Sequence, residues 1–119
     1  MDSSILNSTK KILGIHADDD TFDLDIITFI NSALSTIQTE GVGQSFRIVD
    51  DSAVWDDLAV DEDQLDLIRT IVYLRVRMLF DPPNTSYIQI AMEKQIEELE
   101  WRMNVRREDR QWVDPQEAA

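Results

Sequence analysis

A proline pair past the middle of the chain constrains the fold more than any other feature. The stretch RMLFDPPNTSYIQIAMEKQ, residues 77–95, has helical periodicity on both sides of Asp81, Pro82 and Pro83. Pro82 disfavours a helical conformation at Asp81, and neither proline has a backbone N–H to donate. Because only about five residues separate the two patterns, the sequence predicts an antiparallel αα-hairpin.

The two arms of this hairpin are long helices. The first is predicted over residues 62–79 and is apolar around much of its circumference, which is typical of a central helix. The second is predicted over residues 86–107, and SYIQ matches a capping box in which Ser86 and Gln89 bond each other's free amides. At about 100° per residue, its core stripe comprises Ile88, Met92, Ile96, Leu99 and Met103.

Two more helices are predicted upstream, over residues 3–13 and 21–39. Gly14 follows the first and suits the left-handed conformation that often ends a helix. In both helices the apolar residues recur at three- and four-residue spacing, which places them on one face of each helix. These apolar faces are Ile5, Ile12 and Leu13 in the first helix, and Phe22, Ile26, Phe29, Ile30, Ala33, Leu34 and Ile37 in the second.

The segment between the second helix and the hairpin has mixed character. SFRIV, residues 45–49, alternates apolar and polar residues like a strand, but it is too short to stand alone. DSAVWDDL, residues 51–58, predicts one helical turn capped by Ser52, with Trp55 and Leu58 in the core. The predicted fold class is all-α: a small helical bundle built on a long antiparallel αα-hairpin, with a short strand-like segment near residues 45–49.

The length and residue usage predict one soluble domain. A chain of 119 residues has room for one core, which we assign to residues 1–110, and residues 111–119 are predicted to form a flexible tail. There is no cysteine, so disulfides and thiolate-metal sites are excluded. No apolar run resembles a signal peptide or approaches the ~20 residues of a membrane span, so we expect an intracellular protein without membrane contact.

The charge is strongly negative and unevenly distributed. The formal net charge is -13, which argues against sequence-independent binding of nucleic acid through phosphates. Residues 18–66 contain fourteen acidic residues and one basic residue, Arg47, whereas the ten acids and ten bases elsewhere cancel. Such an asymmetry indicates either a functional acidic surface or a solvated face that favours solubility.

The last predicted helix has a second apolar face. Ile90 and Trp101 lie opposite the core stripe, with Tyr87 and Val105 beside them, and an exposed apolar stripe with a Trp favours a partner surface. Alternatively, Trp101 lies flat under the stems of Glu97 and Lys94. The basic residues Arg102, Arg106 and Arg110 follow at four-residue steps. A contact between copies would bring them to the acidic half, and such head-to-tail contacts can close into rings.

The tail and the polar clusters contain the remaining candidate binding and catalytic groups. In the tail, the apolar pair Trp112 and Val113 indicates either an anchor for another protein or a segment that folds back onto the preceding helix. His16 has no catalytic motif around it. The carboxylates of residues 18–20 and 61–63 do not match a calcium-binding loop, because the required glycine is missing. We therefore expect neither an enzyme nor a bound metal or cofactor.

The combined layout resembles the head-to-tail connector, or adaptor, proteins of long-tailed double-stranded DNA phages. The resemblance covers residues 3–107 and rests on ILGI, DIITFINSALSTI closed by GVG, VWDDL, TIVYLRVRMLFDPP and EELEWRM. It implies a ring, commonly of twelve copies, beneath the portal protein at the neck of the virion, assembled in the host cytoplasm. The ring would extend the DNA channel, retain packaged DNA and dock the stopper or tail completion protein.

The resemblance gives the unusual residues expected roles. Tyr87, Ile90, Trp101, Val105 and the three arginines would contact a neighbouring subunit, and Trp112 and Val113 would reach the portal. Asp56, Asp57, Asp61 and Glu62 would line the channel and repel DNA phosphates, so that DNA passes without specific binding. The short tail with its proline departs from the family pattern, which weakens the portal assignment. Two other classes stay open: an acidic DNA mimic that inhibits a basic partner, and a divalent-metal enzyme or sensor.

Overall fold

Four α-helices and one short 3₁₀ turn form the described part of the chain. The computed structural model describes residues 4–39, 46–58 and 60–111, and the side chains of residues 39 and 106–111 lie outside this description. The all-α prediction is confirmed within these residues, which contain no β-strand and only one isolated bridge, between Ser4 and Val54. The elements are α1 (Ile5–Ile12), α2 (Asp23–Thr39), η1 (Trp55–Leu58), α3 (Glu62–Phe80) and α4 (Ser86–Gln111).

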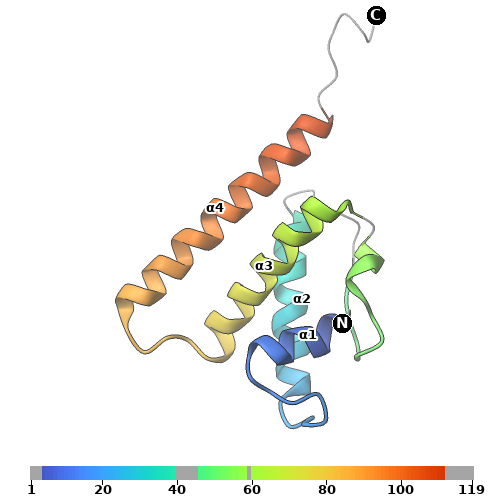
Figure 1. Ribbon diagram of the computed structural model, residues 1–119, viewed down its shortest axis with the longest axis vertical. Coiled ribbons are helices and arrows are strands. Elements are labelled where there is room, and N and C mark those ends of the chain that lie inside the picture. Colours follow the sequence, from blue (N-terminus) through green and yellow to red (C-terminus); the bar gives the residue numbers. More distant parts are fainter. Residues whose placement is uncertain (1–3, 40–45, 59, 112–119) are drawn as a thin grey trace, which may run out of the picture.

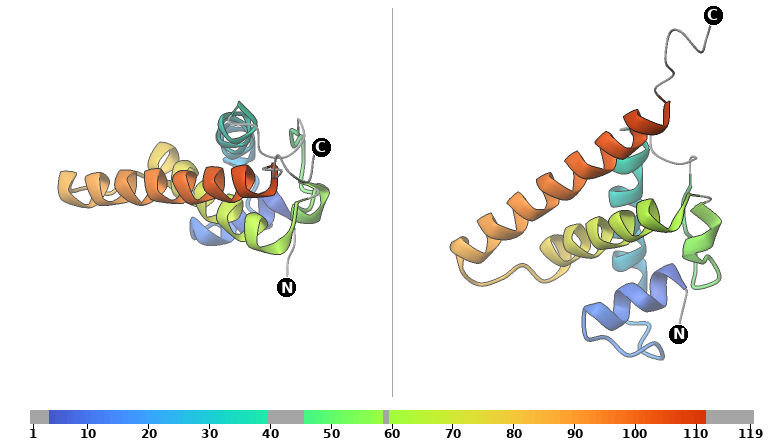
Figure 2. Two further views of the ribbon diagram at one scale, coloured as in Figure 1. Left: turned by 90° about the horizontal axis from the view of Figure 1, so that it is seen from above. Right: turned by 45° about the horizontal axis from the view of Figure 1, so that its top comes forward.

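The α3–α4 hairpin is the axis of the fold, as predicted. Figure 1 shows α3 between α2 and α4, with α4 running back alongside α3 in the opposite direction. The backbone N–H of Asp81 donates to the carbonyl of Arg77 at 2.9 Å and closes α3 directly before the proline pair. The views in Figure 2 show α2 crossing behind the hairpin and α1 lying near the lower part of α2. Helix α4 continues to Gln111, one turn beyond its predicted end.

Two side-chain contacts fix how α3 and α4 lie against each other. The guanidinium of Arg75 bonds the carboxylate of Glu100, with Nε 3.0 Å from Oε1. Near the other end of the hairpin, buried Gln64 donates from Nε2 to the carbonyl of Met103 at 3.3 Å. Because these contacts lie at two levels of the helix pair, they restrain sliding of α4 along α3.

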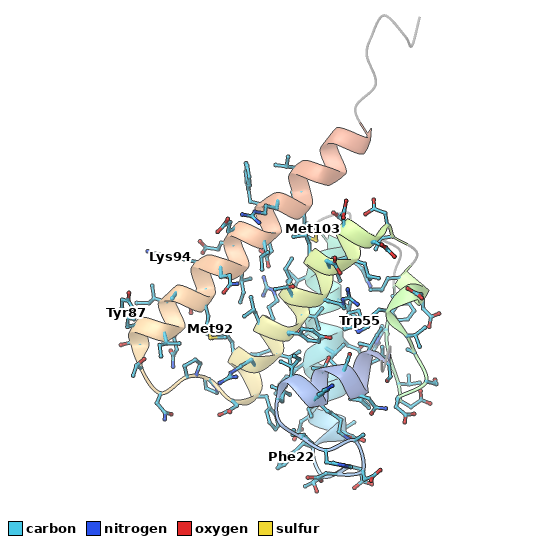
Figure 3. The ribbon with its side chains drawn as sticks, in the orientation of Figure 1. Phe22, Trp55, Tyr87, Met92, Lys94 and Met103 are labelled. Carbon is cyan, nitrogen blue, oxygen red and sulfur yellow. The ribbon has the colours of Figure 1, made fainter. Side chains whose placement is uncertain are left out.

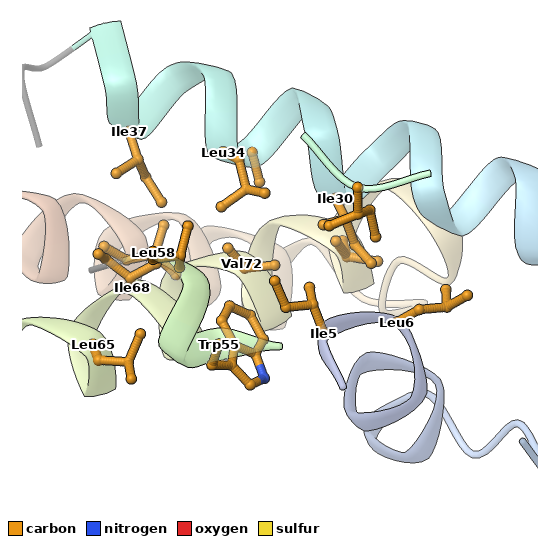
Figure 4. Packing of buried hydrophobic residues seen from close by; sticks show 14 of the residues in the cluster. Ile5, Leu6, Ile30, Leu34, Ile37, Trp55, Leu58, Leu65, Ile68 and Val72 are labelled. Carbon is orange, nitrogen blue, oxygen red and sulfur yellow. The ribbon is translucent and has the colours of Figure 1, made fainter. Parts of the chain in front are cut away.

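The hydrophobic core lies where α1, α2, η1 and α3 meet, and α4 covers it from one side. Figure 4 shows the packing of 14 of the buried side chains, and a fully buried Val, Leu, Ile or Met among them contributes about 1.5–3 kcal/mol. Trp55 packs edge-on against Tyr73, with ring centroids 5.8 Å apart, and its Nε1 donates to Ser8 Oγ at 2.9 Å. The buried cluster comprises Ile5, Leu6, Ile26, Ile30, Ala33, Leu34, Ile37, Ile48, Trp55, Leu58, Leu65, Ile68, Ile71, Val72, Val76 and Met103.

Three predicted core positions are wrong. Ile12 is 50% exposed, because the buried arc of α1 is centred between Leu6 and Thr9 and leaves Ile12 at its edge. Ile88 is 47% exposed, because the first turns of α4 extend beyond the core. Phe22 is partly exposed at the start of α2, although its ring contacts Phe80 edge-on at a centroid distance of 5.3 Å.

The end of α1 confirms the glycine prediction. Gly14 has φ +80°, which places it in the left-handed region where a side chain would be strained. Ile15 N–H donates to the Lys10 carbonyl at 2.8 Å and Gly14 N–H to the Lys11 carbonyl at 3.1 Å. This pair of bonds is a Schellman motif, which satisfies carbonyls that the end of the helix leaves free.

The strand-like segment is not a strand. Residue 45 lies outside the description, and residues 46–49 pair with side chains of α2 instead of another strand. Asn31 donates to the Ile48 carbonyl at 2.9 Å and accepts from the Ile48 N–H at 2.8 Å. Gln38 donates to the Phe46 carbonyl at 2.9 Å. The predicted alternation of Phe46 and Ile48 with polar neighbours nevertheless holds in the described residues, since Ile48 is buried, Phe46 is half-buried and Arg47 is exposed.

Two predicted helix caps are wrong, one of them by a single residue. The Ser52 N–H and hydroxyl both donate to Asp50 Oδ1, so Ser52 does not cap η1. Thr85, not Ser86, caps α4: its Oγ1 accepts from the Ile88 N–H at 3.4 Å. Gln89 does not form the predicted capping box with Ser86, because Thr85 is the capping residue. Its Nε2 donates instead to the Pro83 carbonyl at 2.6 Å.

Candidate functional site

The second apolar face of α4 is open to solvent in the isolated chain. Tyr87 is 83% exposed, Ile90 52% and Trp101 66%, whereas Val105 is half-buried. The alternative in which Glu97 and Lys94 cover Trp101 is therefore wrong, because two thirds of its surface is uncovered. Large exposed apolar side chains gathered along one element indicate an interaction surface.

These residues separate into two surfaces at opposite ends of α4. Tyr87, Ile88 and Ile90 form the first, here called the end patch, and Figure 3 shows Tyr87 at the outer end of the helix, far from Trp55 and the core. Figure 3 also shows Met92 and Met103 on the side of α4 that faces α3. The end patch was only partly predicted, because Ile88 had been assigned to the core.

The second surface is a hollow between α3 and α4, here called the α3–α4 groove. It has a volume of about 460 Å³ and is lined by Asp63, Asp66, Leu67, Thr70, Trp101, Arg102 and Val105. Sequence reasoning found its α4 side and missed its α3 side. The sequence signal for the α3 side of the groove is the pair Leu67 and Thr70, two uncharged residues that lie off the buried face of α3.

The basic residues of α4 are only partly described. Arg102 bonds Glu98 on the same helix, with Nη2 2.6 Å from Oε1, and both side chains are more than half exposed. Such a solvated pair at four-residue spacing stabilises a helix by about 0.3–0.5 kcal/mol. Arg106 and Arg110 belong to α4, but their side chains lie outside the description.

The four acids expected to line a channel lie in η1 and at the start of α3, and two of them support the backbone. Asp57 Oδ2 accepts from the Val54 N–H at 3.0 Å, and Asp61 Oδ1 accepts from the Gln64 N–H at 2.8 Å. Asp61 is thereby the N-cap of α3, where a negative charge also favours the helix dipole. Asp56 and Glu62 are exposed.

Two further acids at turns have lowered pKa values. The Ser52 hydroxyl, followed by its N–H, holds the pKa of Asp50 below the ordinary 3.8. Hydrogen bonds from Thr21 lower the pKa of Asp19 in the same way. A carboxylate that accepts hydrogen bonds is favoured over its protonated form. These acids act as turn anchors, so the acidic half of the chain has a structural as well as an electrostatic role.

Metal-binding clusters are absent from the part of the chain that the structure describes. Within residues 4–39, 46–58 and 60–111, no three His, Asp or Glu side chains gather closely enough to hold a metal ion. His16 is highly exposed, and its Nδ1 accepts from the Asp18 N–H at 3.2 Å. No helix in this part of the chain is long and apolar enough to cross a membrane. Trp112 and Val113, the expected portal anchor, lie outside the description.

Comparison with known proteins identifies one family. A family model described as phage connector protein matches residues 5–110, which include all four helices except the last residue of α4. Comparisons with curated proteins and with solved structures found no match.

Proposed function

The chain belongs to the phage connector protein family, and we propose that its copies form a ring beneath the portal protein. Membership makes it a virion connector protein that associates with other head or tail proteins, and the family is structural. In the proposal, the ring extends the DNA channel at the neck and presents a surface to the stopper or tail completion protein. The family match over residues 5–110 carries this proposal.

The exposed surfaces of α4 support subunit contacts. In the proposed ring, Tyr87, Ile90, Trp101 and Val105 contact neighbouring subunits, and burial of their apolar area drives association. Arg102, Arg106 and Arg110 add contacts to acidic residues of the adjacent copy. Charged side chains at such contacts steer encounter and orientation more than they raise affinity.

The proposed channel surface is the acidic edge formed by η1 and the start of α3. Asp56, Asp57, Asp61 and Glu62 face the DNA in this arrangement. Their charges repel the phosphates, so the genome passes without sticking. The apolar Trp112 and Val113 contact the portal, with the tail of each copy tethering the ring to the vertex.

Negative-stain electron microscopy tests the proposal directly. The protein alone and the protein mixed with the portal of its own phage are imaged side by side. We expect rings, or an added layer on the portal. Particles that stay monomeric or dimeric and leave the portal bare would favour the second candidate, an acidic DNA mimic, whose carboxylates would occupy a basic nucleic-acid-binding protein.

A further inference from the structure

We infer that neighbouring copies bind head to tail, with the end patch of one copy seated in the α3–α4 groove of the next. This inference rests on the proposed ring and specifies which surfaces meet in it. The end patch comprises Tyr87, Ile88 and Ile90, and the groove lies about three turns further along the same helix.

The end patch lies outside the buried core of its own subunit. Among the described side chains of α4, the first buried one is Ile96, more than two turns into the helix. At about 100° per residue, Ile90, Tyr87 and Ile88 span about 160° of the helix circumference, with Ile88 next to the core stripe. All three are 47% exposed or more. An apolar arc on a projecting helix end is the form of an element that inserts into a partner.

The groove has the chemistry to receive such an element. Leu67, Trp101 and Val105 provide apolar contact, and its volume of about 460 Å³ is in the range of pockets that enclose small molecules, ~300–1,000 Å³. A pocket of this size accommodates a few side chains. Trp101 stays 66% exposed at its edge, which leaves an aromatic surface for an incoming Tyr or Ile.

The groove is lined by more acidic than basic side chains. Asp63, Asp66 and Arg102 line it; Asp66 also bonds Arg69, and Arg102 bonds Glu98 on its own helix. Helix α4 has no acidic residue in its first turn, so the positive end of its dipole is not offset there. Lys94 is exposed one turn after Ile90 on the same face, and no ion pair involves it among the described residues.

The end patch cannot fill the groove of its own subunit, because a helix cannot fold onto itself, and in the proposed ring the groove is filled by a second copy. Ile90 and Trp101 are eleven residues apart, which corresponds to about 16 Å along a rigid helix. A patch that differs from the groove it fits makes a heterologous contact, which leaves one patch and one groove free in every dimer. Each added copy repeats the contact, so the assembly of copies grows until the rotation between neighbours closes it into a ring.

The contact is small for a stable pair. Stable interfaces bury about 800 Å² per partner, and three side chains supply only part of this area. A weak pairwise contact that becomes strong when a ring closes, or when the portal gathers the copies, fits assembly on a template.

Chemical cross-linking tests the contact, because the chain has no cysteine of its own. The double variant Ile90→Cys/Val105→Cys is treated with a short bismaleimide linker, alone and on the portal of its own phage. A head-to-tail contact gives a covalent ladder beyond the dimer. The control Val49→Cys/Val105→Cys replaces a valine outside the end patch that is 83% exposed, more than Ile90 at 52%, and should give no ladder. Unchanged circular-dichroism melts verify that both variants fold.

Three other results would overturn the inference, and they separate it from the proposed function. A product that stops at the dimer indicates an antiparallel pair of α4 helices around a twofold axis. A layer on the portal without a ladder means that the protein is a connector whose copies meet through other surfaces. If neither a portal layer nor a ladder forms, the ring itself is wrong.

Discussion

Arg75 and Glu100 form an ion pair across the α3–α4 hairpin, with Arg75 Nε 3.0 Å from Glu100 Oε1. Both side chains are mostly buried, at 31% and 17% exposed. The residues are far apart in sequence, and their contact fixes the relative position of the two helices. The hairpin therefore depends on a polar contact as well as on the apolar stripe of α4.

Removing one partner should lower stability more here than at a solvated pair. For Arg75→Met or Glu100→Gln we expect a loss of about 1–2 kcal/mol, because the remaining group keeps few solvent contacts. The pair Arg102 and Glu98 provides the control, where the same substitutions should cost about 0.5 kcal/mol or less. Urea unfolding of single and double variants measures the coupling. Equal losses at the two pairs would contradict the prediction.

Lys10 should be a major determinant of stability near the start of α2. It is 1% exposed, and its Nζ bonds Asp23 Oδ1 at 2.7 Å and the Ala17 carbonyl at 3.0 Å. Lys10→Met leaves the Asp23 carboxylate without its partner, and we expect a loss of about 3 kcal/mol by thermal unfolding.

Two controls separate the ion pair from general effects of the substitution. Lys11→Met removes the adjacent, exposed lysine and should change the free energy of unfolding by less than about 0.5 kcal/mol. Lys10→Met combined with Asp23→Leu should recover part of the loss, because no charge is then left unpaired. A double variant as unstable as Lys10→Met would indicate that lost packing dominates.

Asp50 should contribute to acid sensitivity. Hydrogen bonds from Ser52 lower its pKa in the folded state below 3.8, so the unfolded chain binds a proton more readily. The resulting stabilisation is present above pH 3.8 and is lost as the pH falls through the folded pKa. NMR titration should show the pKa of Asp50 rising toward its ordinary value in Ser52→Ala, while that of Asp19 stays unchanged. A shift of both pKa values in Ser52→Ala would contradict the interpretation that Asp50 and Asp19 anchor their turns independently.

Trp101 should matter for assembly and not for folding. Trp101→Ala removes a side chain that is 66% exposed, so the circular-dichroism melt should stay close to that of the native chain. Ring or portal-layer formation, scored by electron microscopy, should be lost. Trp55→Ala is the control for a buried tryptophan and should cost about 3–5 kcal/mol. Wholesale unfolding of Trp101→Ala would return this residue to the core.

Arg106 should act through charge. Arg106→Glu should impair assembly more at low salt than at high salt, because exposed charges are screened within about 10 Å at 0.1 M ionic strength. Light scattering across a salt series measures this effect. Lys11→Glu makes the same charge change on an exposed residue of α1 and should have a smaller effect. A defect of equal size at every salt concentration would speak against an electrostatic contact.

The sequence by itself determined the features that depend on neighbouring residues. The end of α3 at Asp81 follows from the ring constraint of Pro82, and the left-handed turn at Gly14 follows from the absence of a side chain. Helical periodicity also identified Ile96 and Met103 as the inner face of α4 and Tyr87 and Trp101 as the outer one.

Only the tertiary structure decided how far each face is covered and which distant groups meet. Periodicity gives the direction of a side chain but neither the width of the covered arc, which leaves Ile12 exposed, nor the point where the core ends, which leaves Ile88 exposed. The double hydrogen bond between Asn31 and Ile48 replaces the expected strand pairing, and the α3–α4 groove joins residues from two helices. Such contacts depend on the relative placement of whole elements, which no local pattern specifies.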